Sequence, residues 1–148
     1  MLIETLKVLF ERDLNKLIHE IELYQKEDNI WITDKEISNS AGNLSLHLIG
    51  NLNTYIGATI GGTNYVRDRE LEFSLKKIPR QDLLASIKET KQVVDQSLDM
   101  ITEAQLNAEY PLLVLEKKTS TIFFLVHLTT HLSYHLGQIN YHRRLLDF

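Results

Sequence analysis

Six histidines are the residues of this 148-residue chain with the clearest capacity for chemistry. The chain has no cysteine, so a transition-metal site in it must use imidazole and carboxylate ligands. His131 and His135 are separated by one helical turn in an uninterrupted helical pattern. At about 100° per residue, two side chains at this spacing project from the same side of a helix. The pair is therefore spaced as two metal ligands would be.

A third ligand must come from another part of the chain, because two imidazoles leave a divalent ion short of donors. His47 is the best candidate, since it lies on the apolar face of another predicted helix and that face points to the protein interior. The pattern predicts one divalent ion held by His47, His131 and His135. Three protein ligands would leave positions open for water or substrate, which is typical of catalytic sites.

Other polar residues near these positions leave alternatives open. His127 and His131 have the same spacing as His131 and His135, so they form a second possible ligand pair. His142 is interpreted as a residue that supports the metal ligands without binding the metal, or as a surface residue. The plainest alternative is that all these histidines are partly buried, hydrogen-bonded core residues without a metal. The residues expected to support the site or orient a substrate are Asn51, Tyr55 and Gln138.

Four long segments have apolar residues at steps of three and four, the spacing of a helix with one buried face. They cover residues 2–27, 44–61, 79–98 and 122–146. The predicted fold is an all-α four-helix bundle forming one domain over residues 1–148. The connection 61–78 is long enough to carry the chain back along the bundle, which predicts up-down-down-up order with a long crossover between the second and third helices.

The two long connections carry further predictions. The cluster Arg67-Asp68-Arg69-Glu70 is interpreted as a solvated loop with local ion pairs. A short hairpin is expected between residues 103 and 118.

Charge and hydropathy limit the partners of the chain. The formal net charge is -4 and no basic block occurs, which argues against nucleic acid as a partner. The sequence contains no long apolar span and no secretory leader pattern, so neither membrane nor secretion is expected and the predicted location is cytoplasmic. A second apolar band on the last helix predicts a homodimer. Its members are Leu125, Leu128, Leu132, Leu136 and Ile139.

Two segments resemble the DinB-like superfamily, which includes relatives of the bacillithiol and mycothiol S-transferases. They are His131-Leu-Ser-Tyr-His135-Leu-Gly-Gln138 and Asn43-Leu-Ser-Leu-His47-Leu-Ile-Gly-Asn51, and the resemblance spans nearly the whole chain. It implies an up-down-down-up four-helix bundle, commonly dimeric, whose metal ligands fall on His47, His131 and His135. It also implies nickel or zinc as the ion, and in characterised relatives the metal activates the thiol of a low-molecular-weight cofactor.

These features favour a metal-dependent enzyme, either a thiol S-transferase or a hydrolase, that acts on a small-molecule substrate. The ion would lower the pKa of a bound water or thiol so that the anion exists near neutral pH. The sequence has no obvious basic cluster for the carboxylates of a thiol cofactor. The alternative is a non-catalytic metal-binding stress-response protein, whose ion mainly joins the second helix to the fourth.

Overall fold

The computed structural model describes residues 2–148, which form an all-helical protein. No strand occurs within this range, where an isolated antiparallel bridge joins Glu109 to Ser120. The prediction of an all-α fold is confirmed. The four longest helices are α1 (Leu2–Leu23), α2 (Ala41–Leu52), α4 (Arg80–Met100) and α6 (Thr121–Leu146). The shorter elements are the 3-10 helix η1 (Glu27–Trp31), the π-helix η2 (Asn53–Ala58), α3 (Arg69–Ser74) and α5 (Glu103–Asn107).

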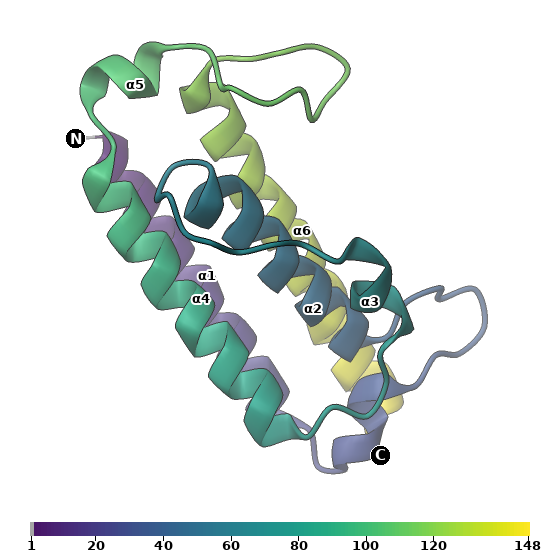
Figure 1. Ribbon diagram of the computed structural model, residues 1–148. Coiled ribbons are helices and arrows are strands. Elements are labelled where there is room, and N and C mark those ends of the chain that lie inside the picture. The colour runs from purple at the N-terminus through teal and green to yellow at the C-terminus, as the bar shows by residue number, and fades with distance from the viewer. Residues whose placement is uncertain (1) are drawn as a thin grey trace.

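The four long helices pack so that each contacts two of the others. Helix α1 packs against α4 and α6, and α2 packs against the same two helices. Figure 1 shows that α1 and α6 run from the end of the molecule that holds α5 toward the opposite end, whereas α2 and α4 run back. The crossover between η2 and α4 returns the chain along the molecule and carries α3, which packs on α2. The metal-site candidates of α2 and α6 therefore lie on adjacent helices.

Side-chain caps begin the helices that carry these candidates. Ser40 accepts a hydrogen bond from the Asn43 amide at the start of α2, and Ser120 accepts one from the Phe123 amide at the start of α6. Each cap satisfies one of the backbone N–H groups that the first turn leaves without a partner.

The first helix ends earlier than its apolar spacing predicts, at Leu23 and not near residue 27. The Asp147 carboxylate accepts hydrogen bonds from the backbone N–H groups of Gln25 and Lys26. Arg80 donates to the Tyr24 carbonyl. These side chains bond to backbone groups that a further helical turn would otherwise pair. Tertiary contacts therefore end the helix.

The second helix changes form after Leu52, where a continuous α-helix was expected. From Asn53 to Ala58 the chain is a π-helix, and Thr59 N–H donates to the Thr54 carbonyl across five residues. The Asn53 amide donates to the Ile49 carbonyl and to Thr90 of α4, which holds the wider turn in place. A π turn contains an extra residue, so the side chains after it are rotated relative to an α-helix.

Two other expectations about packing change. The segment 103–118 does not form the predicted hairpin, because its first part is α5 and the rest is a loop closed by the bridge to Ser120. The apolar band of the last helix is used inside the chain, since Leu125, Leu128, Leu132 and Ile139 are all core residues. Between residues 2 and 148, no helix combines the length and the apolar character that crossing a bilayer requires.

Candidate metal centre

The contact between α2 and α6 brings His47, His131 and His135 together. Each offers one ring nitrogen, and the three nitrogens lie within 4.8 Å of one another. The ring centroid of His47 lies 5.1 Å from that of His131 and 5.3 Å from that of His135. His47 is buried, whereas the two histidines of α6 are half-buried. The three side chains are positioned to hold a metal ion.

The distance between the ring nitrogens of His47 and His131 fits a shared metal ion. Zinc lies about 2.0–2.1 Å from each imidazole nitrogen, so two ligands of a tetrahedral site are separated by about 3.3 Å. The Nε2 atoms of His47 and His131 are 3.2 Å apart. This is also a hydrogen-bond distance, and in that case His131 donates from Nε2 to His47. Its Nδ1 is buried without a hydrogen-bond partner in either arrangement.

Hydrogen bonds on the far side of two rings leave the Nε2 atoms free. His47 Nδ1 lies 3.1 Å from Glu72 Oε1, and His135 Nδ1 lies 2.7 Å from Gln138 Oε1. Both oxygens accept, so each Nδ1 carries a proton, and in the neutral imidazole each Nε2 keeps its lone pair. Bonds of this kind fix the tautomer and orientation of metal-binding histidines. The role expected of Gln138, that of supporting the site, matches this geometry.

Burial keeps His131 and His135 of α6 neutral, which is the form that binds metals. Desolvation, with the neighbouring His135 and His47 rings, lowers the pKa of His131 to about 4. Desolvation also lowers the pKa of His135, although the bond to Gln138 acts in the opposite direction. Both imidazoles are therefore neutral at physiological pH, and neutral imidazole is the ligand.

Glu72 of α3 belongs to the site, and the sequence analysis did not single it out. It is 5% exposed, and besides His47 it accepts two hydrogen bonds from Arg67, at 2.8 Å from Nε and 2.9 Å from Nη2. Burial raises the pKa of Glu72, but the hydrogen bonds from His47 and Arg67 outweigh it and hold that pKa below its ordinary value. Glu72 is therefore an ionised acceptor.

The interpretation of residues 67–70 as a solvated loop with local ion pairs is wrong for Arg67. Its side chain is 14% exposed, and its guanidinium lies over the Tyr55 ring, 5.6 Å from the centroid. The charged group is held inside because buried Glu72 pairs with two of its three nitrogens, Nε and Nη2. The sequence contains one signal of this contact. Gly50 lies within the second helix, one turn after His47, and a glycine inside a helix often marks a close approach by another group.

The other predicted residues have different surroundings. Asn51 is buried, and its Oδ1 has no hydrogen-bond partner. Tyr55, in the π-helix, packs edge-on against Phe124 and its hydroxyl lies 3.4 Å from Arg67 Nη1. His127 is outside the group of three, with its ring 6.4 Å from that of His131. Within the described residues, the alternative pairing of His127 with His131 gains no third ligand.

The expectation for His142 is corrected. It is 4% exposed and serves to join segments: its Nε2–H donates to the Ile32 carbonyl, and the Tyr24 hydroxyl donates to its Nδ1 at 2.6 Å. Both ring nitrogens are thereby used, so His142 has none left for a metal ion.

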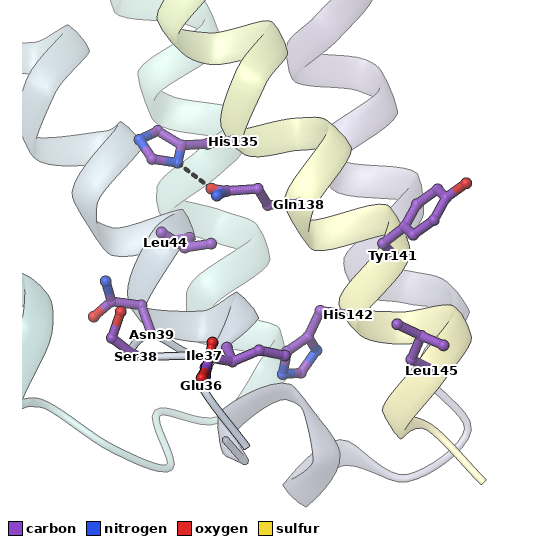
Figure 2. A pocket seen from close by; sticks show the side chains of 10 residues that line it. All are labelled: Glu36, Ile37, Ser38, Asn39, Leu44, His135, Gln138, Tyr141, His142 and Leu145. Carbon is purple, nitrogen blue, oxygen red and sulfur yellow. Dashed lines mark hydrogen bonds between the residues drawn. The ribbon is translucent and has the colours of Figure 1, made fainter. Parts of the chain in front are cut away.

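A cavity of about 420 Å³ opens beside His135. Figure 2 shows His135 and Gln138 at one end of it, with Leu44 next to them and Tyr141 and Leu145 farther along α6. The loop residues Glu36 to Asn39 form another wall. The lining is mostly apolar and contains no lysine or arginine. Its size suits a small molecule.

A comparison with protein families finds one match over almost the entire chain. The family model described as "Protein of unknown function (DUF1572)" matches residues 2–147. No curated protein matches the chain.

Proposed function

Because the chain belongs to the DUF1572 family, whose function is unknown, we propose a function from the geometry of the site. The protein is a metal-dependent enzyme in which His47, His131 and His135 hold one divalent ion, nickel or zinc, inside an up-down-down-up four-helix bundle. The observation that carries this proposal is the convergence of three imidazole nitrogens within 4.8 Å. The hydrogen bonds that keep the Nε2 atoms of His47 and His135 free support it.

The chemistry proposed is nucleophilic attack by a water or a thiol at this centre. A divalent ion bound by three histidines lowers the pKa of a water or thiol in its open position. The protein contributes the orientation of the ligands, through Glu72 and Gln138, and a cavity of mainly apolar walls that limits water around the reacting groups. Gln138 lines this cavity and is the residue we propose to orient a substrate there, whereas Asn51 and Tyr55, which were also expected in this role, do not line it.

The cavity favours a small, uncharged and partly apolar substrate. Ile37, Leu44 and Leu145 contribute apolar walls, and Glu36 is the acidic residue at the edge. No lysine or arginine lines the cavity, so the carboxylates of an anionic thiol cofactor would lack a partner there. We therefore propose that the enzyme transfers a neutral thiol to an electrophile or hydrolyses a neutral ester. An anionic thiol is the less favoured substrate.

Metal content tests the site. After loading with zinc and removal of excess metal, we expect about one zinc ion per chain in the wild-type protein and none in His47→Ala or His131→Ala. His127→Ala is the matched control, because this histidine is on the same helix and outside the group of three. The site is refuted if the His47 and His131 variants keep the same metal content as the control.

Activity is tested separately with the metal-loaded protein. The panel contains neutral and anionic thiols of similar size with an electrophile, followed by simple esters and amides. We expect turnover that His131→Ala abolishes and His127→Ala preserves. A protein that binds zinc yet is inactive with every member of the panel would favour the alternative, a non-catalytic metal-binding protein.

We further propose that the protein is a homodimer, now on the basis of a different surface of α6. Three exposed apolar side chains share one face of the first half of this helix, at steps of three and eight residues, and we call them the outer stripe: Phe123, Val126 and Tyr134. Contiguous exposed apolar surface of this kind often marks an interface. The stripe lies on one face of one helix, which suits a second copy packing about a two-fold axis.

A further inference from the structure

The carboxylate of Glu72 is a buried charged group that contacts a proposed metal ligand and is itself held by Arg67. It reaches His47 from α3, a short helix that packs on α2 from the long crossover. We propose that Glu72, oriented by Arg67, is a positioning residue that holds His47 as its Nδ1–H tautomer with Nε2 facing the ion. This inference rests on the proposed metal site and names the residues that prepare it.

The tautomer follows from the hydrogen-bonding capacity of the groups. An ionised carboxylate only accepts, so the bond of 3.1 Å from Glu72 Oε1 requires a proton on His47 Nδ1. Arg67 Nη2 is also 3.4 Å from the same nitrogen, but a guanidinium only donates, and it has a closer acceptor in Glu72 at 2.9 Å. The shorter contacts are therefore consistent only with Nδ1–H. In the neutral imidazole Nε2 is then the unprotonated nitrogen, and it lies 3.2 Å from His131 Nε2.

Arg67 fixes the plane of the carboxylate. Its Nε donates to Oε2 and its Nη2 donates to Oε1, so two parallel bonds orient Glu72 before any contact with His47 is considered. The guanidinium also balances the charge of a carboxylate that is 5% exposed. Without Arg67, the buried charge of Glu72 would have only the imidazole as a partner.

Gly50 provides the space that this arrangement needs. A Cβ atom at this position would lie 1.8 Å from Glu72 Oε2 and 3.3 Å from Arg67 Nε. Any side chain there would displace the carboxylate from His47. The glycine, the glutamate and the arginine thus form one unit, assembled from α2, α3 and the segment before α3.

The first test reads the tautomer directly in the metal-free wild-type protein. Long-range proton–nitrogen NMR correlations distinguish Nδ1–H from Nε2–H imidazole. We expect His47 to be the Nδ1–H form, and in Glu72→Gln a substantial share of the Nε2–H form. A wild-type His47 protonated at Nε2 would overturn the proposal, whatever the protein does with metals.

The second test measures zinc affinity by competition with a chelator. Carboxylates behind a ligand histidine typically contribute 10- to 100-fold to affinity, so we expect a loss of about that size in Glu72→Gln and in Gly50→Ala. Glu70→Gln is the matched control, because Glu70 is exposed on the same short helix. Circular dichroism confirms that each variant is folded.

The outcomes separate this inference from the metal site itself. Wild-type affinity in a folded Glu72→Gln would overturn the positioning role while leaving the site intact. A wild-type protein that binds no zinc would refute the site, and the NMR measurement would still decide whether Glu72 sets the tautomer of His47. Arg67→Met, which removes both bonds to the carboxylate, should weaken zinc binding in the same direction as Glu72→Gln.

Discussion

Two glycines differ in what an added methyl group would meet. At Gly42 a Cβ would lie 2.5 Å from ring atoms of Trp31, whereas at Gly137 nothing is within 4 Å. Gly137 is exposed in the middle of α6, where glycine is a poor helix former.

We therefore predict opposite effects of two alanine substitutions on the free energy of unfolding. Gly42→Ala should lower it by about 1–3 kcal/mol, because the packed indole must move. Gly137→Ala should raise it by about 0.5–1 kcal/mol, because alanine restricts the unfolded chain and favours the helix. Urea denaturation measures both. Equal effects at the two positions would contradict the packing described for Trp31.

The three histidines that converge could be predicted from the sequence, but the residues that contact them only in part. His131 and His135 are related by helix geometry alone, and His47 was found because it lies on an apolar face. Gln138 was found because it is one turn from His135. Glu72 belongs to the crossover, and its approach to His47 depends on how a six-residue helix packs on α2, which no local pattern encodes.

At the scale of elements, the end of α6 is joined to the end of α1 by a buried pair. The Tyr24 hydroxyl donates to His142 Nδ1, and both side chains are almost fully buried. We predict that Tyr24→Phe lowers the free energy of unfolding by about 1–3 kcal/mol, because a buried acceptor loses its only donor.

The control for this prediction is Tyr141→Phe, on the same turn of α6 as His142. Tyr141 is 62% exposed, so its hydroxyl can bond to water, and the change should stay within about 0.5 kcal/mol. A Tyr24→Phe variant as stable as the Tyr141 control would show that the bond to His142 adds nothing to stability.

A second link between α1 and α6 depends on pH. Glu20 accepts hydrogen bonds from Arg143 at 2.7 Å and Asn140 at 2.6 Å. Burial raises the pKa of Glu20, but these bonds outweigh it and lower that pKa in the folded protein. The folded state therefore binds this proton less readily than the unfolded state, so the carboxylate stabilises the fold above its unfolded pKa, and this stability is lost as the pH falls through the folded pKa.

We predict a difference in the free energy of unfolding between wild type and Glu20→Gln that disappears in acid. Glu20→Gln should be less stable than wild type at neutral pH, and the gap should close as the pH falls below the ordinary pKa of glutamate, about 4.3. Unfolding by urea across a pH series measures it. Exposed Glu22 provides the control, since Glu22→Gln should follow the wild-type curve. A gap that is constant with pH would exclude the charge of Glu20 as its cause.

The four long helices could be predicted because their apolar residues recur at helical spacing. The residues at which most of them end could not be predicted. The last helix begins at Thr121, one residue from the predicted start, because the Ser120 cap is visible in the sequence. The end of α1 depends on Asp147, more than a hundred residues away. The π-helix depends on Asn53 bonding to Thr90 of α4. Contacts of that range leave no periodic signal in the local sequence.

At the scale of the whole molecule, the outer stripe predicts the oligomeric state. We expect wild-type protein to sediment as a dimer and Phe123→Glu to shift it toward the monomer, because the added charge would be buried in the interface. Glutamate suits the first turn of a helix, so this substitution should not disturb the fold.

Val66→Glu is the control for the dimer prediction. Val66 is 88% exposed and lies in the crossover, away from the stripe, so this variant should remain dimeric. A monomeric wild-type protein at micromolar concentration would rule out the interface. A dimer that Phe123→Glu leaves intact would place the interface elsewhere.

The separation of His47 from His131 by 84 positions has a consequence for biosynthesis. A ribosome delivers α2 and the crossover long before it delivers α6, and chains start folding from the N-terminal side. Glu72 follows His47 by only 25 positions, so the imidazole can be oriented while the remaining helices are still being translated. The proposed metal site is completed only when the C-terminal helix docks, so a nascent chain stalled before residue 131 would bind zinc no better than an isolated histidine does.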